Sequence, residues 1–303
     1  MQKTFDSQPI FIGGDGRSGT TLLSVILDSH PELAVGPELH FNGPENLGEY
    51  VEDCLELLIA EDPRVFGKGL KENKHYKLGT QFAKRCHRFG LEFDELRELI
   101  INLKNQTNIS FAKFEERCVL VNAIGEKIAN KRRKKTWGIK IMREIKGLSK
   151  YGKIWPNAHF IHIIRDGRDV TASQMKEHET WGYGDVQEAA KSWVSIIEKA
   201  RKNGRAYNYY EIKYEDIVLR PEDTLKQLMK EMSLPWDDAL LKHNEIDHSI
   251  YKNPYNHASI DSIVKPINES AVGRHKRDLT IEQIQAFNKI ARKMLKELRY
   301  EVE

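Results

Sequence analysis

Short apolar runs recur along the chain and predict β-strands. Each run is apolar throughout or alternates between apolar and polar positions, the patterns of buried and half-buried strands. The runs lie at residues 9–12, 32–36, 137–141, 158–164 and 207–214.

Between these runs, apolar residues spaced three or four apart predict helices. The helical segments lie at residues 20–27, 49–59, 93–103, 111–129, 169–178, 187–202, 221–232 and 281–298. A capping box of Thr280 and Gln283 opens the last one. Gly67, Gly69 and Gly79 are expected to interrupt the helical pattern. Strands that alternate with helices predict an α/β fold with a central, mainly parallel sheet flanked by helices.

We interpret residues 1–303 as a single domain, with a helical insert at approximately 45–135 that covers the edge of the sheet. The basic run at residues 131–135 closes this insert, and such runs are most often a solvated helix end.

Composition describes an ordinary globular protein, with 40% hydrophobic and 31% charged residues. The net charge of +3 is too small to indicate nucleic acid or a membrane surface as a partner. No apolar run approaches the ~18 residues of a membrane span, and no signal-peptide core is present. The widely spaced Cys54, Cys86 and Cys118 indicate a reducing compartment and no zinc site.

A glycine-rich loop joins the first predicted strand to the first predicted helix. Its sequence from residue 13 to 19 is GGDGRSG. Bare backbone N–H groups at the start of a helix form a cradle for anions, usually phosphate. Gly14 and Gly19 fit the P-loop spacing, but Thr20 stands where a P-loop has its lysine. Arg17 is the only cation in the loop, so the loop suits a phosphate that carries something other than a polyphosphate; a ligand-free turn is the alternative.

The run Arg17-Ser-Gly-Thr-Thr-Leu-Leu resembles the 5′-phosphosulfate-binding loop of sulfotransferases that use 3′-phosphoadenylyl sulfate (PAPS). With Asp28-Ser-His-Pro31 after it, the stretch is most similar to the tyrosylprotein-sulfotransferase branch and its bacterial relatives. The resemblance implies a P-loop-like sulfotransferase fold, PAPS as sulfonate donor, adenosine 3′,5′-bisphosphate as product and no required metal. The loop residues that it assigns to the cofactor are Arg17, Ser18, Gly19, Thr20 and Thr21.

A second motif follows the fourth predicted strand. Arg165 ends that strand, and Ser173 comes eight residues later. An arginine fork and a hydroxyl suit phosphate oxygens, although Arg165 could instead pair with Asp166 or Asp169 in a structural role. The family resemblance implies that this element binds the 3′-phosphate of the cofactor.

A third motif runs from Ser259 through Lys265 to Arg274 and is similar to a C-terminal segment of the same family. The resemblance makes Ser259 a candidate at the sulfonate, and Lys265 and Arg274 cofactor contacts, with Arg274 in place of the family lysine. Tyr214, in a Tyr-Glu-Asp sequence, corresponds to a family tyrosine beside the nucleotide.

Transfer of a sulfonate to a hydroxyl needs a base and cations around the reacting group. Glu38 follows a predicted strand and lies 21 residues after Arg17, the interval of the catalytic glutamate in the family. His40 is the alternative base, because imidazole titrates near neutrality. Lys140 lies 25 residues before Arg165, as the catalytic lysine of the family does, and shares with Arg17 the stabilisation of the developing charge.

Two positions depart from the family pattern. Ile139 replaces an Asp or Asn before the lysine, and Glu177 replaces an arginine four residues after Ser173. The second departure puts one cofactor contact in doubt.

The sequence therefore predicts a cytoplasmic, bacterial PAPS-dependent sulfotransferase that acts on a hydroxyl of a peptide tyrosine, a glycan, a lipid or a small metabolite. The insert is expected to shape the acceptor site, and a basic insert surface would favour an acidic peptide. A P-loop nucleotide kinase and a non-catalytic nucleotide-binding module are the alternatives.

Overall fold

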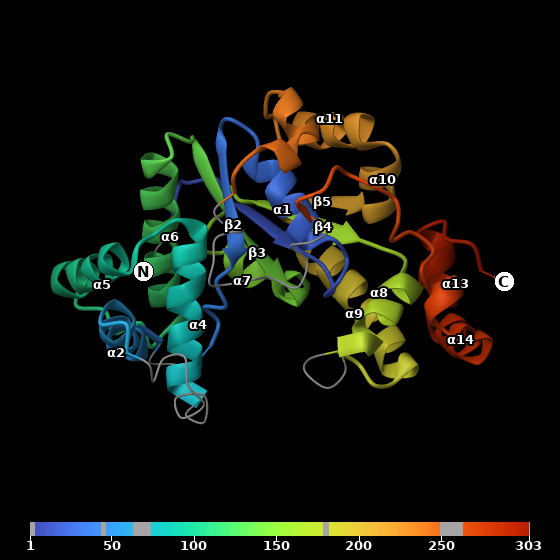
Figure 1. Ribbon diagram of the computed structural model, residues 1–303, viewed down its shortest axis with the longest axis horizontal. Coiled ribbons are helices and arrows are strands. Elements are labelled where there is room, and N and C mark those ends of the chain that lie inside the picture. Colours follow the sequence, from blue (N-terminus) through green and yellow to red (C-terminus); the bar gives the residue numbers. More distant parts are fainter. Residues whose placement is uncertain (1–3, 44–46, 63–73, 178–181, 249–262, 303) are drawn as a thin grey trace.

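The computed structural model describes residues 4–43, 47–62, 74–177, 182–248 and 263–302. Within these residues, the core is a five-stranded sheet in the order β2-β3-β1-β4-β5, and every strand pair is parallel (Figure 1). The strands are β1 (Ile10–Gly13), β2 (Leu33–Glu38), β3 (Thr136–Met142), β4 (His159–Ile164) and β5 (Asn208–Lys213). The predicted α/β fold with a mainly parallel sheet is confirmed.

The central strand β1 is buried on both faces, and its side chains alternate between two hydrophobic clusters. Ile10 and Ile12 pack with Leu23 and Ile26 of helix α1 (Thr20–Asp28). Phe11 points to the opposite face, where it belongs to the cluster that holds the insert helices. Because helices cover both faces, the strand is apolar throughout, as is usual in parallel sheets.

The remaining helices form layers around the sheet and are bounded as follows: α7 (Ser149–Gly152), α8 (Gly167–Gln174), α9 (Val186–Gly204), α10 (Tyr214–Leu219), α11 (Pro221–Glu231), α13 (His275–Asp278) and α14 (Ile281–Glu297). Short 3₁₀ turns are η2 (Arg143–Gly147), η3 (Met175–Glu177), η4 (Asp238–Leu241) and η5 (His243–Glu245). The predicted capping box of Thr280 and Gln283 opens α14. In Figure 1, α10 and α11 lie on one side of the sheet, and α13 and α14 lie at the end opposite the insert.

The insert between β2 and β3 contains α2 (Leu47–Ile59), α4 (Lys74–Phe89), α5 (Phe93–Thr107) and α6 (Phe114–Lys131). These helices gather beside β2, the edge strand, and α4 and α6 both contact it (Figure 1). Gly67 and Gly69 lie outside the described residues.

The prediction that Gly79 interrupts a helix was wrong, because this glycine lies inside α4. A Cβ at Gly79 would come within 2.9 Å of the Tyr50 carbonyl oxygen and 3.0 Å of Cys54 Sγ. The glycine therefore lets α4 approach α2 closely. This packing outweighs the cost of about 1 kcal/mol of having glycine rather than alanine inside a helix.

The basic run at the end of α6 is engaged in contacts within the protein. Lys131 pairs with Glu95 at 2.7 Å, and Arg132 pairs with the buried Asp28 at 2.6 Å. Lys134 donates to the His30 carbonyl oxygen at 2.7 Å. These contacts fasten the end of α6 to neighbouring segments, and none of these cations lines the cavity described below. They give no support to a basic surface for acidic peptides.

None of the helices in the described part of the chain is both long enough and apolar enough to span a membrane. Cys54, Cys86 and Cys118 are all buried and free. The described residues also contain no group of three or more His, Cys, Asp or Glu side chains that could hold a metal ion.

Candidate active site

A cavity of about 890 Å³ opens at the carboxyl ends of the strands. Its wall includes the glycine-rich loop after β1, the ends of β2 and β3, Arg165 directly after β4, helix α4 of the insert, and residues between 263 and 274. In an open parallel sheet, ligands bind at the carboxyl ends of the strands, beside the topological switch point where the strand order reverses. Here that point lies at β1, with β3 on one side and β4 on the other.

The glycine-rich loop is held in one conformation by close packing and by a buried carboxylate. Gly19 caps α1 with φ of +97°, and a Cβ there would lie 2.5 Å from the ring of Tyr214. Asp15 accepts hydrogen bonds from the Gly16 backbone N–H at 2.8 Å and from Arg143 Nε at 2.6 Å. The start of α1 thus faces the cavity with its backbone donors in place, which suits an anion.

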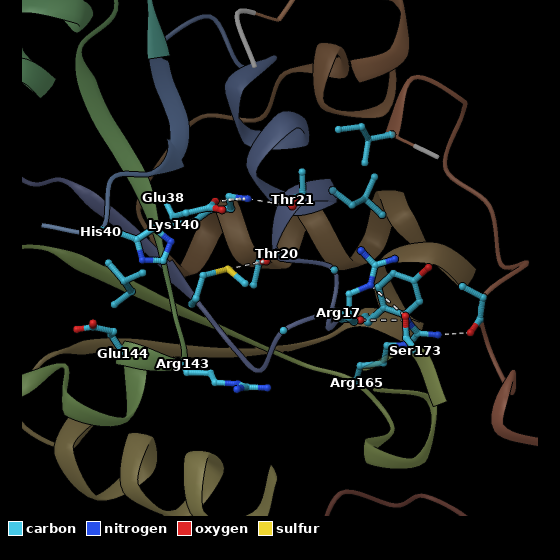
Figure 2. A pocket seen from close by; sticks show the side chains of 18 of the residues that line it. Arg17, Thr20, Thr21, Glu38, His40, Lys140, Arg143, Glu144, Arg165 and Ser173 are labelled. Carbon is cyan, nitrogen blue, oxygen red and sulfur yellow. Dashed lines mark hydrogen bonds and ion pairs between the residues drawn. The ribbon is translucent and has the colours of Figure 1, made fainter. Parts of the chain in front are cut away.

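Glu38 and Lys140 meet at one end of the cavity (Figure 2). A register shift in the pairing of β2 with β3 sets Glu38 opposite Lys140, and the two side chains form an ion pair of 2.7 Å. Lys140 is only 1% exposed and also donates to the hydroxyl of Thr21 at 2.9 Å. Glu38 is the last residue of β2 rather than a residue after the strand. A carboxylate, an ammonium group and a hydroxyl therefore converge beside the start of α1.

His40 lines the cavity near this pair, with a positive φ of 52° (Figure 2). Much of the surface of His40 is exposed, and the residue forms part of the cavity wall. Desolvation by the neighbouring residues, together with the cation of Arg85, lowers the pKa of His40 to about 4. The lowered pKa makes this imidazole a weaker base than an unperturbed histidine.

Arg17, Arg165 and Ser173 come together at a second position in the cavity (Figure 2). Arg17 Nε donates to the Ser173 hydroxyl at 3.0 Å, and Arg165 Nη1 donates to the Arg17 carbonyl oxygen at 3.1 Å. The Arg165 guanidinium lies 4.6 Å from the ring centre of Tyr214. It also pairs with Asp169 at 3.5 Å, one of the two structural partners considered above.

One hydrogen-bond donor of Arg165 has no acceptor among the described residues. Its Nε is buried and has no hydrogen-bond partner in the part of the chain that the structure describes. Leaving such a donor unsatisfied costs about 1–3 kcal/mol, so the site suits an added acceptor such as a phosphate oxygen.

Most of the sequence-predicted site residues line this one cavity. They are Arg17, Gly19, Thr20, Thr21, Glu38, Lys140, Arg165, Ser173, Tyr214 and Arg274.

Three predicted residues are not placed in the cavity wall. Ser18 is buried, and its backbone N–H donates to the Asp15 carbonyl oxygen, but it does not line the cavity. Lys265 is exposed and also lies outside the wall. Ser259 lies outside the described residues, as does the side chain of Glu177.

Sequence reasoning missed a group of polar residues that line the cavity near His40. From the insert, α4 contributes Gln81 and Arg85. Arg85 makes no hydrogen bond or ion pair with the residues that the structure describes, and burial lowers the pKa of its guanidinium while the charge of Glu38 raises it. No motif in the sequence distinguishes Arg85 from the other basic residues of that helix.

Glu144, Tyr151 and Asn42 form a second missed group in the same part of the wall. Tyr151 donates to Glu144 Oε2 at 2.7 Å, Lys150 donates to the same oxygen at 2.9 Å, and Asn42 contacts both Glu144 and Tyr151. Glu144 follows β3 almost directly, so its place at a strand carboxyl end was a signal that the sequence offered.

Comparison with known proteins gives a consistent result. A family model described as "Sulfotransferase family" matches residues 9–238. The Drosophila melanogaster protein-tyrosine sulfotransferase is 24% identical over 274 residues, which is 88% of this chain and 46% of that protein. Protein-tyrosine sulfotransferase A of Caenorhabditis elegans is 23% identical over 269 residues, 87% of this chain and 60% of that protein. This chain therefore spans about half to two thirds of the length of these relatives.

Among solved structures, the sulfotransferase domain of the Synechococcus PCC 7002 olefin synthase superposes with a TM-score of 0.60 and 19% identity. The alignment covers 100% of this chain and 99% of that domain. The sulfotransferase domain from the curacin biosynthetic pathway gives a TM-score of 0.57 at 17% identity, covering 98% and 99% of the two chains. At these identities the superpositions show a shared fold.

Proposed function

Since the chain belongs to the sulfotransferase family, we propose that it transfers the sulfonate of PAPS to an acceptor hydroxyl. One observation carries the proposal: a single cavity holds two separate cationic sites, Lys140 beside Glu38 at one and Arg165 beside Ser173 at the other. PAPS carries anionic groups at its 5′ and 3′ positions, so a donor of this kind needs two such sites.

The residues present fit this donor. The backbone N–H groups at Gly19 and Thr20, at the start of α1, suit the 5′-phosphosulfate. The unsatisfied Nε donor of Arg165, together with the Ser173 hydroxyl, suits the 3′-phosphate. Tyr214 offers a ring beside these groups for the base of the nucleotide.

In this proposal Glu38 accepts the proton of the acceptor hydroxyl as its oxygen attacks the sulfur. The bond between sulfur and the 5′-phosphate oxygen breaks, and the donor leaves as adenosine 3′,5′-bisphosphate. Lys140 and Arg17 stabilise the charge that develops on the transferred sulfonate and on the leaving phosphate oxygen. The Glu38–Lys140 ion pair supports these roles, because it holds base and cation at one place before any ligand binds. This chemistry needs positioning and charge stabilisation but no metal ion.

The acceptor side of the cavity is formed by His40, Arg85 and Glu144. The names of the sequence relatives favour a peptide tyrosine as acceptor. Folds of this kind serve many substrates, so a glycan and a small-molecule or lipid hydroxyl are tested beside the tyrosine.

The first experiment is a thermal-shift titration with adenosine 3′,5′-bisphosphate, AMP, and ATP with magnesium. A ligand at about 100 times its dissociation constant stabilises the folded state by roughly 2.7 kcal/mol. We expect a large shift with the bisphosphate and little with AMP. A shift with magnesium ATP as large as that with the bisphosphate would instead indicate a nucleotide kinase, because the kinase needs no 3′-phosphate site.

Transfer itself is then measured with radiolabelled PAPS against a panel of phenolic, carbohydrate and peptide hydroxyls. Selective binding of the bisphosphate with no labelled product from any acceptor class would favour a nucleotide-binding module over an enzyme.

A further inference from the structure

Asp169 is a fully buried carboxylate in α8, one helical turn after Arg165. It does not line the cavity, and the roles proposed above do not use it. It nevertheless accepts hydrogen bonds from two segments that are more than a hundred residues apart in the sequence.

The first segment contains Arg165, just before α8 begins, and Asp169 Oδ2 lies 3.5 Å from Arg165 Nη2. The same nitrogen of Arg165 also contacts the Ala271 carbonyl oxygen. Arg165 is therefore held from two sides, by the carboxylate and by the second segment.

The second segment precedes and begins α13. Asp169 Oδ1 accepts from the His275 backbone N–H at 2.9 Å and from His275 Nδ1 at 2.5 Å, and Oδ2 accepts from the Gly273 backbone N–H at 2.8 Å. Arg274, which lines the cavity, stands between the two residues that this carboxylate holds. Gly273 has φ of +70°, a conformation that glycine adopts without strain and that turns the chain here.

The carboxylate is stabilised as an anion at this position. Burial alone would raise the pKa of Asp169, but the hydrogen bonds from His275 and the charge of Arg165 outweigh it and hold the pKa below its usual value. A buried carboxylate with this many donors is costly to replace, because each donor left without an acceptor loses its own hydrogen bond.

We propose that Asp169 is a positioning residue for recognition of the 3′-phosphate: it fixes Arg165 directly and Arg274 through the backbone on both sides of it. The inference rests on the proposed function, since it concerns the same nucleotide site. In this proposal the preference for a 3′-phosphorylated nucleotide depends on Asp169, although Asp169 does not contact the nucleotide.

The test compares the dissociation constants of adenosine 3′,5′-bisphosphate and AMP by isothermal titration calorimetry. Asp169→Asn keeps the side-chain volume and removes the charge and one acceptor. We expect its preference for the bisphosphate over AMP to fall by about tenfold or more, because charge-assisted contacts of Arg165 and Arg274 are lost while AMP makes none of them. The affinity for AMP should stay close to that of the unmodified protein.

Two further variants separate positioning from general damage. His275→Gln removes one of the four donors to Asp169 and should reduce the preference in the same direction by a smaller factor; it also carries the test if Asp169→Asn fails to fold. Thr171→Val is the matched control, because the Thr171 hydroxyl is buried in the same helix and bonds only to the Gly167 carbonyl oxygen among the described residues. It should lower the melting temperature without changing the preference.

The possible failures are distinguishable. If the unmodified protein binds both nucleotides equally, the proposed function falls, and this inference falls with it. If the unmodified protein prefers the bisphosphate and Asp169→Asn and His275→Gln keep that preference, or lose affinity for both nucleotides equally, Asp169 is merely structural and only the inference is overturned.

Discussion

The two ends of the cavity are built in different ways. At the proposed donor end, Arg17, Arg165 and Ser173 come from loops and a helix directly after β1 and β4, and they are hydrogen-bonded to one another. At the proposed acceptor end, Arg85 comes from a helix of the insert and makes no hydrogen bond within the described residues. The donor end is thus assembled before any ligand binds, whereas the acceptor end keeps a charged group available.

Under the proposed function, this difference would let the acceptor site vary while the donor site stays the same. The donor end depends on strand carboxyl ends, which the parallel sheet fixes. The acceptor end depends on which helices lie between β2 and β3 and on how they approach the edge strand. Four substitutions test the division.

The largest effect is expected from Glu38→Gln, which removes the proposed base at the junction of the two ends. We expect kcat to fall by roughly 10²–10⁴-fold, the usual contribution of a general base. The affinity for adenosine 3′,5′-bisphosphate should remain, because the glutamine keeps the shape of the side chain. Single-turnover transfer and calorimetry measure the two quantities, and an equal loss in both would refute the role of Glu38 as base.

Arg165→Lys should disturb only the donor end. A lysine keeps the charge but loses the planar fork, so affinity for the bisphosphate should fall roughly 10–100-fold while the KM for the acceptor stays constant. Arg168→Lys is the control, because Arg168 is a similarly buried arginine three residues later, in α8, and its described side-chain bonds go to Asp166. The same loss of affinity in both variants would point to damage of the helix rather than to a phosphate contact.

Arg85→Gln should disturb only the acceptor end. An available guanidinium favours an acceptor with a negative group, so the KM for 4-hydroxyphenylacetate should rise about tenfold. The KM for its neutral amide, 4-hydroxyphenylacetamide, should change little. Lys84→Gln, next to Arg85 but outside the cavity wall, serves as control. A change in nucleotide affinity on Arg85→Gln would break the separation of the two ends.

The smallest effect is expected from His40→Asn. Because the pKa of His40 is lowered to about 4 by burial and by Arg85, the ring binds a proton only as the pH falls towards that value. The pH profile of kcat between about pH 6 and 8 should therefore keep its shape in the variant. The disappearance of an ionisation in that range would show that His40, and not Glu38, is the titrating base.

The sequence predicted which residues would meet around Arg17 and Arg165 better than those around Arg85, for a physical reason. Gly19 and Arg165 belong to continuous sequence motifs that directly follow apolar strands. Both the motifs and the strands can be recognised from the amino-acid sequence. Lys140 was noticeable as a charge inside an apolar strand. Its contact with Glu38 depends on a register shift between β2 and β3, which no local pattern encodes.

Helix α4 and the contacts of Asp169 could not be predicted in the same way. In the sequence Gly79 looks like a helix breaker, and its close packing against α2 can be seen only in the structure. The predicted break in the helix at Gly79 was therefore wrong. Asp169 was considered as a partner of Arg165, and that contact exists. Its bonds to Gly273 and His275 join residues more than a hundred positions apart, and a single sequence contains no record of such pairs.

The strand order also has a consequence for the protein during its synthesis. Ile10 of β1 pairs with Gly138 of β3 and His159 of β4, so the strand that precedes the glycine-rich loop is translated long before either neighbour. At about 5–20 residues per second, the ribosome needs roughly 6 to 25 seconds to reach β3 after β1. During that interval the insert helices can form local contacts, whereas β1 has no partner on either side. A nascent chain could therefore gain no stability from the proposed nucleotide until the strand that ends at Ile164 has left the ribosome.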